Sequence, residues 1–182
     1  MPLRPRPSHA PLLAALLAGG VVAATPALAA AAALKPGLWS YSLLTRRGDG
    51  PPMNLAQMLR SLPAAARPRV EARLRAQGMG IGPDGGLRIC LDAGSLSAGH
   101  PPLHLPGRCT EHWKLSAPGD WNFHYACTQP TVDGRGSLRI SAPTSYASDY
   151  TVTGPQGSVS GSAHAHWLAS ACGGVPPLGM AR

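Results

Sequence analysis

Acidic and aromatic residues are scarce in this chain. Only 8 of its 182 residues are Asp or Glu, against 16 Lys and Arg, which gives a formal net charge of +8. Aromatic residues make up 5% of the chain, with a single Phe, whereas Gly (22) and Pro (20) are abundant. So much Gly and Pro approaches the composition of disordered chains, but a hydrophobic content of 44% is enough for a packed core. At this length we expect one domain, which excludes a large two-domain enzyme.

Motifs of catalysis are also missing. The G-x-S-x-G elbow of serine hydrolases does not occur, and the carboxylates are scattered without an evident pair for acid–base chemistry. The letters G-x-G-x-x-G run from Gly80 to Gly85. They follow a predicted helix and lead into a predicted strand, which is the reverse of the context that dinucleotide binding needs. We therefore expect a protein that is not an enzyme and carries no cofactor.

A long apolar run occurs at the N-terminus. Two arginines within the first six residues precede it, and Ala27-Leu28-Ala29 follows as a cleavage site. This layout predicts a signal peptide over residues 1–29 and a single β-rich domain over residues 30–182, in the periplasm or secreted. The alternative is an uncleaved anchor, which the Ala-rich, Gly- and Pro-containing run disfavours. After cleavage we expect no integral membrane span.

Short segments in which apolar and aromatic residues alternate with polar ones predict half-buried strands. The predicted strands cover residues 37–45, 86–92, 110–116, 120–127, a segment around 138–141, 145–153 and 158–168. Turn residues separate most of them, as expected for consecutive antiparallel strands. The sequence therefore predicts a mainly β fold: an antiparallel meander sheet that is either open or partly closed into a β-barrel.

The clearest hairpin surrounds Ala117-Pro118-Gly119, which is a turn signal. Its register places Trp113 opposite Phe123 on one face and His112 opposite His124 on the other.

A short helical insertion is predicted over about residues 53–78, between the first two strands. Asn54 is a suitable N-cap for its first helix, Pro68 suits the first turn of its second helix, and Gly78 is placed to end it. The insertion is rich in arginine, and the residues that we predict to attract anionic surfaces are Arg67, Arg69, Arg73 and Arg75. Aromatic residues are not interleaved with them, so we expect no nucleic-acid partner. The alternative is a solvated helix face without a ligand.

Several short motifs in a fixed order carry a resemblance. They are Leu34-Lys35-Pro36-Gly37-Leu38-Trp39, Arg88-Ile89-Cys90-Leu91-Asp92, Cys109 and Cys127 around the aromatic hairpin, and Trp167-Leu168 before Cys172. Over essentially the whole mature chain the sequence resembles a family of small exported bacterial proteins, domain of unknown function 3617. Ser40 is a departure, since an acidic residue is expected there. The resemblance implies a periplasmic, β-rich, disulfide-bonded protein and supplies no catalytic residue.

An even number of cysteines in an exported chain indicates two disulfides. The four are Cys90, Cys109, Cys127 and Cys172. A metal site is the alternative, but no C-x-x-C spacing occurs. We predict sequential pairing, Cys90–Cys109 and Cys127–Cys172, because it joins the end of one strand to the start of the next. The hairpin register instead opposes Cys109 to Cys127, which leaves the alternative pairing open.

His164 and His166 lie two residues apart on a predicted strand. Residues at this spacing share a face, so both imidazoles could reach one copper or zinc ion. The alternative is a solvated, Ser-rich face without a ligand.

The sequence favours an exported, non-enzymatic binding or envelope-associated module. Two further hypotheses remain: a periplasmic metal-binding protein that uses His164 and His166, and a carrier of a small ligand or lipid if the sheet encloses a cavity.

Overall fold

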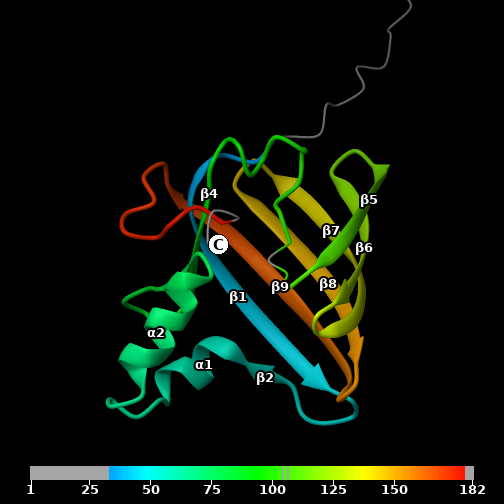
Figure 1. Ribbon diagram of the computed structural model, residues 1–182. Coiled ribbons are helices and arrows are strands. Elements are labelled where there is room, and N and C mark those ends of the chain that lie inside the picture. The colour runs from blue at the N-terminus through cyan, green and yellow to red at the C-terminus, as the bar shows by residue number, and fades with distance from the viewer. Residues whose placement is uncertain (1–32, 104, 106, 179–182) are drawn as a thin grey trace, which may run out of the picture.

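The computed structural model describes residues 33–103, 105 and 107–178, and the predicted signal peptide lies outside this part of the chain. Figure 1 shows one strongly curved antiparallel sheet, with two helices beside one of its ends. The strands are β1 (Gly37–Arg47), β2 (Met53–Asn54), β3 (Met79–Ile81), β4 (Leu87–Leu91), β5 (Cys109–Ala117), β6 (Asp120–Thr128), β7 (Thr131–Ala142), β8 (Ser145–Gly154) and β9 (Gly157–Ala169). The helices are α1 (Leu55–Arg60) and α2 (Arg67–Ala76).

The sheet is open. Its strand order is β3-β4-β1-β9-β8-β7-β6-β5, with the short β2 paired to β1, and all these pairings are antiparallel. Strands β5 to β9 form the predicted meander. The first strand β1 then pairs with the last strand β9, and β4 and β3 continue outward from it. The open alternative is therefore confirmed, and the barrel alternative is wrong, because β3 and β5 are left as separate edges.

The two faces of the sheet differ as the alternation predicts. On β9, Ala163 and Ala165 are fully buried, whereas His164 and His166 are exposed. The predicted hairpin register is also confirmed, with Trp113 opposite Phe123 and His112 opposite His124. We call the face that carries Ala163, Trp113 and Phe123 the inner face, and the face that carries the histidines the outer face.

Glycines on the inner face make room for aromatic rings. A Cβ on Gly134 would collide with the ring of Tyr125, and one on Gly136 would collide with Phe123 and with a backbone oxygen of β8. Each glycine is paired directly with that aromatic residue across β6 and β7. The rings can therefore lie down against the sheet instead of standing up from it, which is how glycine and aromatic pairs commonly pack in curved sheets.

The helical insertion forms where it was predicted. Asn54 caps α1 by accepting a hydrogen bond from the backbone N–H of Gln57 at 3.1 Å, and Pro68 lies in the first turn of α2. Gly78 follows α2 with a φ of 76°, a left-handed conformation that favours glycine. The G-x-G-x-x-G letters lie in β3 and in the turn from β3 to β4, so they lead into a strand and do not open a helix.

The two disulfides are Cys90–Cys172 and Cys109–Cys127. The predicted sequential pairing is therefore wrong. It assumed that β4 and β5, which are consecutive in this part of the chain, are also neighbours in the sheet. Instead β4 pairs with β1, which lies beside β9, so the chain end that follows β9 reaches Cys90. Cys109 and Cys127 lie directly opposite one another on β5 and β6, as the hairpin register indicated.

Candidate functional site: a cavity under a covering loop

The segment between β4 and β5 runs over the inner face of the sheet (Figure 1). We call the described residues of this segment, 92–103, 105, 107 and 108, the covering loop. Leu96 packs against the cluster around Trp39, whereas Leu103 and Leu105 pack against the cluster around Phe123. Because each end of the loop lies next to a disulfide, at Cys90 and at Cys109, the loop is anchored on both sides.

A histidine holds the middle of the covering loop against the sheet. The ring of His100 stacks on Trp113 with a centroid distance of 3.9 Å and meets Trp121 edge-on at 4.9 Å. His100 is 9% exposed, and its Nδ1 lies 3.1 Å from the carbonyl oxygen of Pro101. The indole nitrogen of Trp121 is buried without a hydrogen-bond partner among the described residues. His100 is therefore held against Trp113 and Trp121 by packing of the rings.

A cavity of about 250 Å³ lies between the inner face and the covering loop. Tyr41, Tyr125, Tyr146 and Tyr150 line it from the sheet, together with Ser148, and Leu103 lines it from the loop. The rest of its lining is mainly aliphatic, aromatic and proline side chains, and no Asp, Glu, Lys or Arg is found among the described residues that form it. The volume lies slightly below the range of ligand sites, which run from roughly 300 to 1,000 Å³.

All four tyrosines of the chain line this cavity. Burial raises the pKa of Tyr41 to about 12, with a smaller contribution from the neighbouring Tyr150. Burial likewise raises the pKa of Tyr146, Tyr150 and Tyr125, the last of these also through the negative charge of Asp133. The phenols are therefore neutral at physiological pH.

Neutral phenols and a serine give the cavity a specific chemistry. Each hydroxyl can donate one hydrogen bond and accept others, whereas the surrounding walls provide only apolar contact. A charged ligand would lose its hydration without meeting an opposite charge, which is costly. The cavity therefore suits a small uncharged molecule that is mostly apolar and carries a hydrogen-bonding group.

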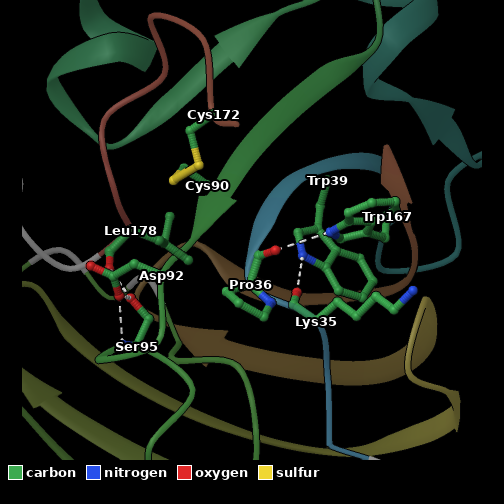
Figure 2. Close-up of a disulfide and its surroundings, with 9 residues drawn as sticks. All are labelled: Lys35, Pro36, Trp39, Cys90, Asp92, Ser95, Trp167, Cys172 and Leu178. Carbon is green, nitrogen blue, oxygen red and sulfur yellow. Dashed lines mark hydrogen bonds between the residues drawn. A yellow bond between two sulfur atoms is a disulfide. The ribbon is translucent and has the colours of Figure 1, made fainter. Parts of the chain in front are cut away.

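The motif of residues 34–39 connects the start of β1 to the end of β9 through hydrogen bonds and a ring contact. The indole N–H of Trp39 donates to the carbonyl oxygen of Lys35 at 3.1 Å, and that of Trp167 donates to Pro36 at 3.0 Å (Figure 2). The ammonium of Lys35 lies 5.0 Å from the centroid of the Trp167 ring, a cation–π contact. Gly37 has a φ of 134°, and a Cβ there would collide with the carbonyl oxygen of Ala169.

The motif around Cys90 completes this end of the molecule. Asp92 accepts hydrogen bonds from the backbone and hydroxyl of Ser95, which hold the pKa of its carboxyl below the ordinary value. The Ser95 hydroxyl also lies 3.0 Å from the carbonyl oxygen of Leu178, whose N–H donates to Cys90 (Figure 2). The residues that carry the family resemblance are therefore explained by packing, capping and cross-linking. Ser40 is the position where the resemblance leads us to expect an acidic residue. Its hydroxyl accepts a hydrogen bond from the guanidinium of Arg88 at 3.3 Å, so the side chain at this position faces a cation.

The predicted metal pair shares the outer face of β9, as expected. Serines surround it, because His164 lies opposite Ser42 and His166 lies between Ser40 and Ser145. Within the described ranges, no group of three or more His, Cys, Asp or Glu is arranged to hold a metal ion. A site at His164 and His166 stays a prediction that rests on two imidazoles. On the same face, His124 instead pairs with Asp133, with 2.7 Å between Nε2 and Oδ2.

The four arginines of the predicted anion site are exposed on α2. They do not form a single face, since Arg69 and Arg73 lie one turn apart on one side of the helix and Arg67 and Arg75 on the opposite side. Arg67 also lines a hollow together with acidic residues, Glu71 among them. Binding of anionic surfaces by α2 stays a prediction.

The covering loop was missed by the sequence reasoning, although its composition holds a signal. Leu103 and Leu105 alternate in a stretch with Pro101 and Pro102, which is too apolar for a solvated connection.

None of the helices within the described residues is long and apolar enough to cross a membrane. No protein-family model matches the chain, and neither the curated proteins nor the solved structures contain a significant match.

Proposed function

We propose that this chain is an exported, non-enzymatic binding module that holds one small uncharged ligand in the cavity under the covering loop. The observation that carries the proposal is the cavity itself: about 250 Å³, uncharged, and lined by all four tyrosines and Ser148. The two disulfides are consistent with an oxidising, exported environment. The resemblance to domain of unknown function 3617 supports the same setting.

A binding titration tests the proposal. The uncharged fluorophore N-phenyl-1-naphthylamine becomes brighter in apolar surroundings, so saturable enhancement at one site per chain is expected. Ser148→Leu places extra bulk in the cavity and should abolish the enhancement. Its matched control is Ala147→Leu, the neighbouring residue on β8, whose side chain lies on the outer face.

Circular dichroism and thermal unfolding of both variants show whether each one folds. If a folded Ser148→Leu protein binds the fluorophore as the wild type does, or if the wild type does not bind it, the proposal is wrong.

A further inference from the structure

A second hollow lies on the opposite side of the sheet and does not share the cavity's chemistry. It crosses β1, β9, β8, β7 and β6 on the outer face, with a volume of about 760 Å³, and Pro52 contributes to its lining. We call it the outer trough. Its polar lining includes Arg46, Asn122, Arg135, Asp149, Thr151 and Ser160.

The strand register arranges these side chains in rows across the sheet. One row runs from Arg46 through Ser160 and Thr151 to Arg135. The adjacent row runs from Ser162 through Asp149 and Ser137 to Asn122. Neighbouring strands are roughly 4.8 Å apart, so the two arginines lie about 14 Å from one another along the row. Hydroxyl groups fill the space between them.

The two arginines are available to a ligand. Neither Arg46 nor Arg135 takes part in a salt bridge within the described part of the chain, and both are exposed. On the same strand and face, by contrast, Arg139 is held by Asp120 at 2.9 Å. Guanidinium groups bind carboxylates and phosphates through paired hydrogen bonds, so each free arginine offers a site for such an anion.

The remaining side chains select among anionic partners. Serine and threonine hydroxyls and the Asn122 amide both donate and accept hydrogen bonds, whereas Asp149 only accepts. Asp149 would repel a purely anionic polymer but would accept hydrogen bonds from the hydroxyl groups of a sugar. Phe123 and Tyr150 are among the residues that line the trough, but the strand register places the side chains of the described aromatic residues of β6, β8 and β9 on the inner face. Stacking of nucleic-acid bases is therefore not provided for.

We infer that the outer trough binds an extended acidic saccharide, a chain of sugars that carries carboxylate or phosphate groups. Arg46 and Arg135 would bind the anionic groups, and Asp149, Asn122 and the hydroxyls between them would bind the sugar hydroxyls. The net charge of the chain is +8, and +6 after removal of the two arginines of the predicted signal peptide (8 − 2), which would help to attract such a ligand. This inference does not depend on the function proposed for the cavity.

Isothermal titration calorimetry at low salt tests it with four probes. These are a short oligogalacturonate (carboxylates), phosphomannan (phosphates), neutral maltohexaose and polyphosphate, which has charge without sugar. Binding of the oligogalacturonate or of phosphomannan is expected, and which of them binds identifies the anionic group. No binding of maltohexaose and weaker binding of polyphosphate are expected.

Three variants separate the saccharide site from general electrostatic attraction. Arg135→Gln should weaken binding about tenfold or more, because it removes charge-assisted hydrogen bonds. Its matched control Arg139→Gln removes the same charge from the same strand and should leave binding unchanged. Asp149→Asn should also weaken binding, although it makes the trough more positive.

Equal losses in the two arginine variants would overturn the inference, as would polyphosphate binding that Asp149→Asn strengthens. Binding of N-phenyl-1-naphthylamine should be unchanged in all three variants, so failure of the trough and failure of the cavity can be told apart.

Discussion

The burial of the cavity tyrosines leads to a quantitative prediction for alkaline pH. The pKa of Tyr41 is raised from 10.0 to about 12 in the folded protein. In the unfolded chain this phenol ionises near pH 10, whereas in the folded protein it keeps its proton for about two further pH units. Because the folded-state pKa is raised, the stabilising contribution is complete below pH 10 and is lost as the pH rises from 10 to about 12.

The size of the effect follows from this difference. Each pKa unit corresponds to about 1.36 kcal/mol, so Tyr41 contributes about 2.7 kcal/mol to the free energy of unfolding below pH 10. About 1.4 kcal/mol of this contribution is lost at pH 11. Tyr41→Phe removes the ionisable group. Between pH 8 and pH 11, the wild type should therefore lose about 1.4 kcal/mol more free energy of unfolding than the variant does. Urea unfolding followed by tryptophan fluorescence measures both values.

A second measurement needs no variant. Since every tyrosine of the chain lines the cavity, the absorbance of tyrosinate in the folded protein reports on this site alone. We expect all four phenols to ionise above the ordinary pKa of 10, with Tyr41 at about 12. A full step at pH 10 in a protein that is still folded would refute the reasoning, because it would mean that the phenols are in contact with bulk water.

Three further predictions concern the framework and the outer face. Replacing both cysteines of Cys90–Cys172 by alanine should lower the free energy of unfolding by about 4.5 kcal/mol, and replacing both of Cys109–Cys127 should lower it by about 3.2 kcal/mol. The first loss is larger because that disulfide closes a loop with a sequence separation of 82, against 18 for the second. Denaturant unfolding that gave the reverse order would contradict this. Gly136→Ala should destabilise the fold by about 1–3 kcal/mol, since its Cβ meets Phe123 and backbone, whereas Gly174→Ala, with open space around it, should be close to neutral in thermal unfolding. If His164 and His166 hold a metal, calorimetry should show stoichiometric binding of Cu(II) that His164→Ala removes, and the absence of heat with the wild type would exclude the site.

Local patterns determined the strands and their faces. Alternation placed Ala163 inward and His164 outward, because successive side chains of a strand point to opposite faces regardless of what lies next to it. The turn at Ala117-Pro118-Gly119 determined the register of β5 and β6, and the Asn54 cap and Gly78 delimited the helical insertion. These features depend on residues close together in the chain, so they can be predicted from sequence.

The tertiary structure decided what depends on contacts between distant segments. The sheet is open because β4 and β3 continue outward from β1 and leave β3 and β5 as separate edges. The pairing of β1 with both β9 and β4 brought Cys172 to Cys90, which the order of the cysteines along the chain does not reveal. The same topology sent the covering loop across the inner face, where it gathers four tyrosines from three strands around one cavity. On the outer face, the register across four strands set Arg46 and Arg135 in one row. The cavity and the outer trough are each made of residues far apart in sequence, and only the arrangement of the strands brings them together.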